Sequence, residues 1–341
     1  MKKTIILTGA TGYIGSHTWC ALLEAGYDVI GLDNFCNSSM EVIGRISAIT
    51  QSTLNFIEGD VRDASLLDSI FQQHKIDAAI HFAALKAVGE SVEKPLTYYD
   101  TNLNGLLNLC SVMARHSVKT LVFSSSATVY GDPDSVPIKE DAPLRTTSPY
   151  GQTKLMGEQI LRDLEHSDRD WKIGYLRYFN PVGAHKSGLI GENPRGVPNN
   201  LMPYVAQVAV GKLEKLRIYG GDYPTQDGTG VRDYIHVMDL AEGHVSAVSH
   251  LLDDGASGNG SFTVNLGAGH GISVLEVIHA YEKACGRPIP YEIVPRRSGD
   301  VAAYYADPSL ASEILDWRAT RGLDVICSDS WRWQNMNPDG I

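Results

Sequence analysis

The first half of the chain alternates short apolar runs with longer stretches in which apolar residues recur at helical spacing. The short runs are rich in β-branched residues and predict buried strands, at 4–7, 29–32, 55–60, 79–82 and 121–123. The longer patterns predict helices at about 17–25, 41–50, 64–73, 95–116 and 149–166. This alternation is typical of an α/β fold with a Rossmann-type, doubly wound parallel sheet.

Beyond about residue 180 the alternation loosens, and prolines and glycines gather in what we expect to be long functional loops. We expect a first domain over 1–180 and a smaller α/β domain over 181–341, with some segments of the second packing on the first. A strand is predicted at 262–266. Ser273 and Glu276 form a capping box, which explains the Gly-rich stretch before them as a simple turn into a helix.

Three glycines, Gly9, Gly12 and Gly15, follow the first predicted strand, and Asp33 ends the second. Strand, glycine turn, helix, strand and acid form the pattern of a dinucleotide-binding unit. The glycines allow the backbone to approach a pyrophosphate at the helix N-terminus. Asp33 would bond the adenosine ribose and repel a 2′-phosphate, so the pattern favours NAD over NADP.

Tyr150 and Lys154 lie four residues apart at the start of the last of these helices. That spacing puts both side chains on one helix face. A phenol has an ordinary pKa of about 10, and a neighbouring ammonium favours the phenolate and moves that pKa toward neutrality. The pair therefore predicts a base that takes a proton from an alcohol. The simpler alternative is a surface helix that carries a Tyr and a Lys.

Composition narrows the possible partners. The 29 basic and 40 acidic residues give a net charge of −11, which argues against general nucleic-acid or membrane-surface binding. No apolar run approaches the 18 residues of a membrane span. The five cysteines are far apart and show no metal-type spacing, so we expect no metal site and a reduced, cytoplasmic setting.

Five segments together resemble the extended short-chain dehydrogenase/reductase family, and within it the nucleotide-sugar 4-epimerases. They are TGATGYIGS (8–16), SSSATVYG (124–131), LRYFNPVGA (176–184), DGTGVRDYIH (227–236) and PRRSGD (295–300). The resemblance runs over essentially the whole chain. Thr101 departs from it, because relatives often have Asn there, beside the retained Asn102.

The resemblance implies a set of site residues. Catalysis is assigned to Tyr150, Lys154 and Ser126. The residues that would bind the cofactor are Gly9, Gly12, Tyr13, Ile14, Gly15, Asp33, Asn34, Asn37, Ser38, Asp60, Val61, Phe82, Ala83, Ala84, Lys86, Asn102, Ser126, Tyr150, Lys154 and Phe179. Those that would bind the substrate are Lys86, Ser126, Tyr150, Asn180, Asn200, Leu201, Tyr219, Arg232, Arg297, Asp300 and Tyr304.

The resemblance also implies an activity. A UDP-hexose would be oxidised at C4 beside NAD, the 4-keto sugar would turn over, and hydride return would invert the centre, which interconverts UDP-glucose and UDP-galactose. The bulky Tyr304 favours this pair over N-acetyl sugars. A nucleotide-sugar 4,6-dehydratase is the alternative, but the segment Ser126-Ala127-Thr128 lacks the acidic residue that dehydratases place there. A homodimer through a helix bundle is also expected.

Overall fold

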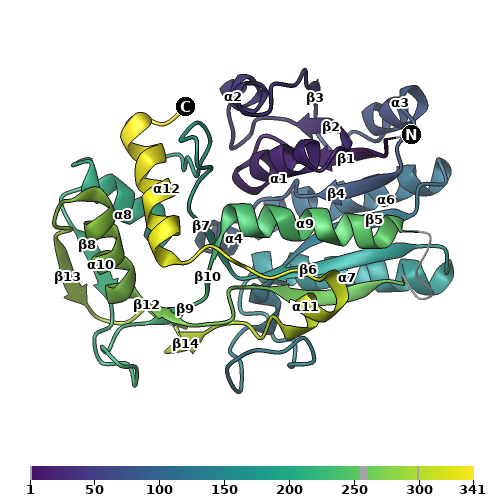
Figure 1. Ribbon diagram of the computed structural model, residues 1–341. Helices are drawn as coiled ribbons and strands as arrows, with labels where there is room; N and C mark the ends of the chain where they lie inside the picture. The colour runs from purple at the N-terminus through teal and green to yellow at the C-terminus, as the bar shows by residue number, and fades with distance from the viewer. Residues whose placement is uncertain (1, 254–259, 298) are drawn as a thin grey trace.

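The computed structural model describes residues 2–253, 260–297 and 299–341, and its centre is a seven-stranded parallel sheet (Figure 1). The strand order is β11-β6-β5-β4-β1-β2-β3. The bounds are β1 Thr4–Thr8, β2 Asp28–Asp33, β3 Asn55–Glu58, β4 Ala78–His81, β5 Thr120–Ser126, β6 Lys172–Tyr178 and β11 Phe262–Leu266. The chain order reverses between β1 and β4, and α/β sheets bind ligands beside such a switch point.

Helices cover both faces of the sheet because successive strand residues point to opposite sides. Ile5 and Leu7 belong to one buried core and Ile6 to the other. The first core packs under α1 Tyr13–Glu24, α2 Glu41–Thr50, α9 Val237–Leu252 and α11 Ser309–Leu315. The second packs under α3 Ala64–Gln73, α6 Gly105–Arg115 and α7 Pro149–Ser167. Figure 1 shows the resulting three layers.

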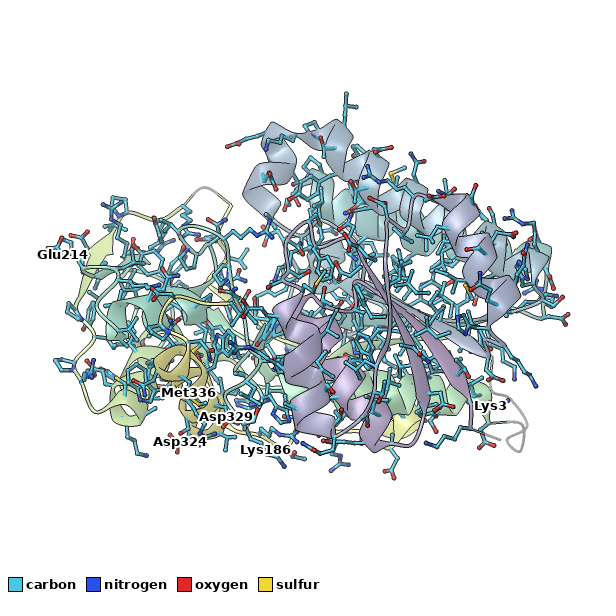
Figure 2. All side chains as sticks on the ribbon, turned by 90° about the horizontal axis from the view of Figure 1, so that it is seen from above. Lys3, Lys186, Glu214, Asp324, Asp329 and Met336 are labelled. Atoms are coloured by element: carbon cyan, nitrogen blue, oxygen red, sulfur yellow. The ribbon has the colours of Figure 1, made fainter. Side chains whose placement is uncertain are left out.

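A smaller lobe has its own apolar core, which includes Val205, Ile278 and Cys327. It contains α8 Leu201–Ala209, β8 Leu216–Tyr219, α10 Val274–Cys285, β13 Tyr291–Val294 and α12 Leu323–Met336. Five short strands lie between the lobes, namely β7 Asn180–Val182, β9 Val231–Arg232, β10 Tyr234–His236, β12 Ile272–Ser273 and β14 Ala303–Tyr304. In Figure 2, Glu214 marks the far end of this lobe and Lys3 the far end of the sheet.

Segments after residue 180 do return to the large sheet. Strand β11 pairs with β6, and α9 packs against α1. The predicted strand at 262–266 and the capping box of Ser273 and Glu276 are both confirmed. The predicted helices at 41–50 and 64–73 are confirmed at both ends.

Other boundaries differ from the prediction. The helix expected at 95–116 is found with nearly the predicted ends, from Pro95 to Arg115, but α5 Pro95–Tyr99 and α6 are joined by a π-helical turn, Asp100–Asn104. The short helix α4 Val88–Glu93 before it was not predicted. The third strand ends at Glu58 rather than at residue 60, and the first helix begins at Tyr13 rather than at 17. Strand β6 was not among the predicted strands.

Candidate active site

Ser126 and Tyr150 meet at the carboxyl end of β5. Ser126 is the last residue of that strand, and its side chain lies close enough to the Tyr150 phenol to lower the pKa of that phenol. Helix α7 begins sharply because Ser148 accepts a hydrogen bond from the Gly151 N–H at 3.1 Å and Pro149 occupies the first helical position. This local sequence puts Tyr150 on the first turn, and only 9% of it is exposed.

Lys154 lies one turn further along α7 and is buried. Its Nζ donates to the backbone oxygen of Ser124 at 2.6 Å and lies 6.0 Å from the centre of the Tyr150 ring. Burial lowers the pKa of Lys154 to about 8. Tyr150 and Lys154 therefore lie on one face of α7, as their spacing predicts, and both side chains are buried.

The expected effect of Lys154 on the Tyr150 pKa is not found in the protein alone. Burial raises the pKa of Tyr150, because it disfavours the phenolate, and the Ser126 side chain acts in the opposite direction. Lys154 directs its Nζ to the Ser124 carbonyl instead. The phenolate must therefore be stabilised against a desolvation cost, which makes every nearby cation important.

The glycine turn joins three segments at close range. Gly9 has φ +69°, and a Cβ there would lie 2.8 Å from the Ala83 nitrogen. A Cβ on Gly15 would lie 2.1 Å from the Gly9 oxygen. Gly12 precedes α1, whose N-terminus has no side-chain cap and no acidic residue in its first turn. The first N–H groups of α1, from Tyr13 and Ile14 onward, are therefore suited to an anion such as a pyrophosphate.

Asp33 organises the loop after β2. Its carboxylate accepts hydrogen bonds from the Thr11 N–H at 3.0 Å, the Phe35 N–H at 2.9 Å and the Ser38 hydroxyl at 3.3 Å. A carboxylate has about four lone-pair sites, so it retains capacity for a ribose hydroxyl. The sequence predicted the ribose contact but not this structural role.

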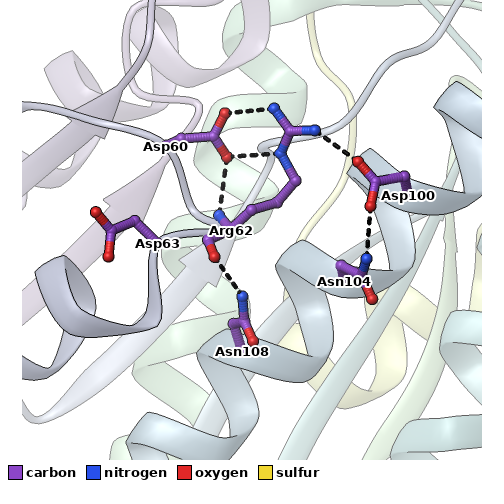
Figure 3. Close-up of a pocket in the computed structure, with 6 residues that line it drawn as sticks. All are labelled: Asp60, Arg62, Asp63, Asp100, Asn104 and Asn108. Carbon is purple, nitrogen blue, oxygen red and sulfur yellow. Dashed lines mark hydrogen bonds and ion pairs between the residues drawn. The ribbon is translucent and has the colours of Figure 1, made fainter.

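A polar cavity of about 590 Å³ opens beside Asp60 (Figure 3). Arg62 bridges Asp60 and Asp100, with contacts of 2.8 and 2.7 Å, and its hydrogen bonds lower the pKa of Asp60 to about 2. Asn34 also donates to Asp60 at 2.9 Å. Asp60, which lines this cavity, and the buried Val61 next to it in the chain are the residues predicted to meet an adenine.

The loop after β4 carries Phe82, Ala83 and Ala84 and is held by Asn102. The Asn102 amide accepts from the Leu85 N–H at 2.8 Å and donates to the Leu85 oxygen and to Thr153, both at 3.0 Å. All three bonds go to protein groups, so Asn102 positions this loop rather than offering a free amide to a ligand. Its neighbour Thr101 lies in the π-helical turn.

Among the predicted substrate residues, Asn200 and Lys86 share one partner, whereas Asn180 is bonded to another part of the chain. Asn180 donates to the Asp233 oxygen at 2.9 Å. Asn200, which precedes Leu201 at the start of α8, donates to Glu192 at 3.0 Å, and Lys86 contacts the same carboxylate at 3.3 Å.

The two remaining cationic residues, Arg232 and Arg297, come from different segments. Arg232 Nη2 lies 3.7 Å from Asp300, while its Nη1 donates to the Val301 oxygen at 2.9 Å. The Arg297 guanidinium lies over the Tyr219 ring at 3.7 Å. Ser298, next to it, lies outside the described residues. Both guanidiniums keep donors available for an anionic ligand.

Tyr304 and Phe179 form an aromatic wall, with ring centres 5.6 Å apart. The Tyr304 hydroxyl donates to the Ala127 oxygen at 2.5 Å, directly after Ser126 in the chain. This bond fixes the Tyr304 ring beside Ser126.

Three important residues were missed by sequence reasoning. Glu158 continues the spacing-four series of Tyr150 and Lys154, which was an available signal. Asp233 is fully buried and accepts backbone N–H bonds from Ala268, Gly269 and Ala306. No sequence pattern pointed to Glu192.

The described part of the chain shows neither a metal-binding cluster nor a membrane-spanning helix. Its His, Cys, Asp and Glu residues form no group of three or more that could hold a metal ion. None of the helices in these ranges is both long enough and apolar enough to cross a membrane.

Comparison with known proteins agrees with this geometry. A family model described as GDP-mannose 4,6 dehydratase matches residues 6–330. The chain is 57% identical to UDP-glucose 4-epimerase of Bacillus subtilis (strain 168), over 98% of each chain, and 55% identical to that of Dictyostelium discoideum, over 98% of this chain and 97% of the other. The crystal structure of UDP-glucose 4-epimerase from Bifidobacterium longum, in complex with NAD+ and UDP, superposes with a TM-score of 0.94 at 55% identity, covering 99% of this chain and 100% of the other. With its parallel sheet, glycine turn and Ser-Tyr-Lys group, the chain belongs to the UDP-glucose 4-epimerases of the extended short-chain dehydrogenase/reductase family.

Proposed function

We propose that this protein interconverts UDP-glucose and UDP-galactose by oxidising and re-reducing the hexose at C4, with NAD as its cofactor. The observation that carries the proposal is the buried group of Ser126, Tyr150 and Lys154 at the carboxyl edge of the sheet. It lies on the same edge as the glycine turn, in a chain of the epimerase family.

The dinucleotide crevice fits NAD. The uncapped first turn of α1 suits the pyrophosphate, and the acceptor capacity of Asp33 suits an unphosphorylated ribose. Asp60 and Val61 would contact the adenine, and Lys154 the nicotinamide ribose. When bound, NAD takes up the C4 hydrogen as hydride and returns it, so the net redox change is zero.

Proton transfer is the task of the protein. Tyr150 takes the proton of the hexose 4-hydroxyl, directly or through Ser126. After the keto sugar has turned over, Tyr150 returns a proton to the C4 oxygen, and the configuration at C4 is then inverted. The Lys154 ammonium lies 6.0 Å from the centre of the Tyr150 ring, and we infer that it favours the phenolate once the cofactor is bound, since burial dominates the Tyr150 pKa in the protein alone. Positioned acid–base groups of this kind contribute about 10²–10⁴-fold to rate.

The substrate is held mainly through its UDP part. Arg232 and Arg297 offer guanidinium forks to the diphosphate, and Asp300 accepts from the ribose. Asn180, Asn200, Leu201 and Tyr219 complete the nucleotide-sugar site. A weakly held hexose can then turn about its bond to the diphosphate and present either face to the same base.

Tyr304 sets the preference for glucose and galactose. Its ring is fixed by the bond to Ala127 and by contact with Phe179, so it is a rigid wall. A rigid bulky wall disfavours the added volume of an N-acetyl group at C2. We infer the same preference that the sequence predicts.

We also infer a homodimer in a reducing, cytoplasmic compartment. Helices α4, α5 and α6 expose Val88, Val92, Leu96 and Leu107, with exposed fractions of 48, 63, 82 and 43%. Exposed apolar side chains on consecutive helices fit an association surface. All five cysteines are free thiols, which fits a reducing setting. Light scattering that finds the mass of one chain would contradict the dimer.

The direct test gives purified protein UDP-galactose without added NAD and follows UDP-glucose by chromatography. Conversion supports both the reaction and a retained cofactor. A 4-keto-6-deoxy product would identify a dehydratase instead, and stoichiometric NADH in solution would identify a one-way dehydrogenase. Failure to convert any UDP-sugar, even with NAD supplied, would overturn the proposal.

A further inference from the structure

Residues 183–200, which we call the strap, connect β7 with α8 and contact the loops that follow three neighbouring strands. After β1, the Tyr13 hydroxyl donates to the Gly183 oxygen at 2.7 Å. After β4, Lys86 pairs with Glu192 at 3.3 Å. After β2, Arg195 contacts residues 34–38, which we call the ribose loop because the adenosine ribose is expected there. These three loops lie at the carboxyl edge where the dinucleotide crevice is expected.

Arg195 connects the strap to the ribose loop with three hydrogen bonds. Its Nη1 donates to the Cys36 oxygen at 2.7 Å, and its Nη2 donates to the oxygens of Ser38 at 3.0 Å and Phe35 at 3.2 Å. A planar guanidinium can serve three carbonyls of one turn at once, which a point charge such as Lys cannot do equally well. Asp33 bonds the same loop through the Phe35 N–H, so the loop is held from both sides.

The two parts of the strap are anchored very differently. The first part is tied to α12, where the Trp333 indole donates to the Glu192 oxygen at 3.1 Å and Arg332 donates to the Lys186 oxygen at 2.8 Å. The tip is residues 194–199. Within the described ranges, the hydrogen bonds that connect this tip to the rest of the chain all come from Arg195. Its neighbours Gly196 and Val197 are exposed.

We propose that Arg195 is a cofactor-retaining residue, which fastens the tip of the strap over the ribose loop and so slows the release of NAD. The proposal rests on the NAD site of the proposed function and adds a residue to it. A dinucleotide that leaves the crevice must pass between the strap and the loops after β1, β2 and β4. Lifting the tip requires the three Arg195 bonds to break, whereas the first part of the strap can remain on α12.

The test measures how fast bound NAD leaves the protein. Wild type, Arg195→Gln, Arg195→Lys and Arg169→Gln are loaded with NAD, separated from free nucleotide and diluted into an NAD trap. Retained NAD is then quantified by chromatography over time. Arg169, in the turn after α7, is the matched control, since it is also exposed and its side-chain hydrogen bond among the described residues goes to His166 at the end of α7.

We expect Arg195→Gln to release NAD about ten-fold faster or more, because the three hydrogen bonds that hold the tip to the loop are lost. Arg195→Lys should fall between it and wild type, and Arg169→Gln should match wild type. Activity lost by Arg195→Gln on dilution should return when NAD is added. Equal release rates for Arg195→Gln and Arg169→Gln would overturn the proposal. Release needs no turnover, so a wild-type protein that retains NAD but fails to convert UDP-galactose would count against the proposed function alone.

Discussion

Glu158 and Arg177 form a bidentate ion pair inside the protein, with 2.8 Å from Nε to Oε1 and 2.6 Å from Nη2 to Oε2. Their side chains are only 1% and 2% exposed. Glu158 lies on α7, one turn beyond Lys154, while Arg177 lies on β6, and Ser125 of β5 donates to Glu158 at 2.6 Å. The pair therefore ties the face of α7 that carries Tyr150 and Lys154 to two strands of the sheet.

Glu158→Gln should destabilise the protein by about 3–5 kcal/mol, because it leaves the Arg177 charge buried and unpaired. Turnover of the folded fraction should also fall, since the same pair sets the position of α7. Arg162→Gln is the control: Arg162 contacts Glu158 at 3.3 Å but is 48% exposed, and such pairs contribute under about 1 kcal/mol. Urea unfolding that gave the two variants equal stability would contradict this account.

The same pair predicts a pH dependence. Burial by itself raises the pKa of Glu158, but the hydrogen bonds and charge of Arg177 outweigh it and hold the pKa below its ordinary value. A carboxyl with a depressed folded pKa contributes stability above its unfolded pKa of about 4.3 and loses it as the pH falls. The stability difference between wild type and Glu158→Gln should therefore narrow below about pH 4, as measured by urea unfolding. A difference that widened there would contradict the assignment.

Tyr150→Phe should lower kcat by about 10²-fold or more, since the variant keeps the ring but lacks the group that takes the proton. Ser126→Ala should cost less, because Tyr150 can then accept the proton directly. Both are measured as UDP-glucose formed from UDP-galactose. Near-full activity of Tyr150→Phe, or a larger loss in Ser126→Ala, would assign the principal base to another group.

The hydrophobic pattern and short motifs of the sequence predicted those parts of the fold that depend on interactions between residues close together in the chain. Strand alternation, the glycine turn and the Ser273 cap are each determined within a few residues, and each was found. The π-helical turn near 100 was missed because Asn102 bonds the distant Leu85 and Thr153. Glu192 was missed because Lys86 lies 106 residues away in the chain, and the shift of the Tyr150 pKa depends on burial that only the assembled fold creates.

Tyr304→Ser should allow the enzyme to accept N-acetylated UDP-sugars more readily. Removal of the ring opens the wall beside Ala127, so activity on UDP-N-acetylglucosamine relative to UDP-glucose should rise by about 10- to 100-fold. Tyr304→Phe keeps the ring and loses only the hydroxyl bond of 2.5 Å, so its preference should stay close to that of wild type. Ratios of kcat/KM for the two sugars check this. If both variants shifted the ratio equally, ring volume would not be the determinant.

Lys154→Met should abolish most activity and yet stabilise the protein at neutral pH. The pKa of Lys154 is lowered by burial from 10.5 to about 8, so the unfolded chain binds more protons than the folded one between these values, and wild-type stability rises with pH there. At pH 7 the buried cation costs up to about 3 kcal/mol, offset by about 1 kcal/mol from the bond to the Ser124 oxygen. Urea unfolding at pH 7 should thus favour Lys154→Met by about 2 kcal/mol, and the advantage should shrink as the pH rises from 8 to 10. If Lys154→Met were less stable than wild type at every pH from 7 to 10, or if its extra stability did not change with pH, the buried Lys154 ammonium would not destabilise the folded protein as we infer.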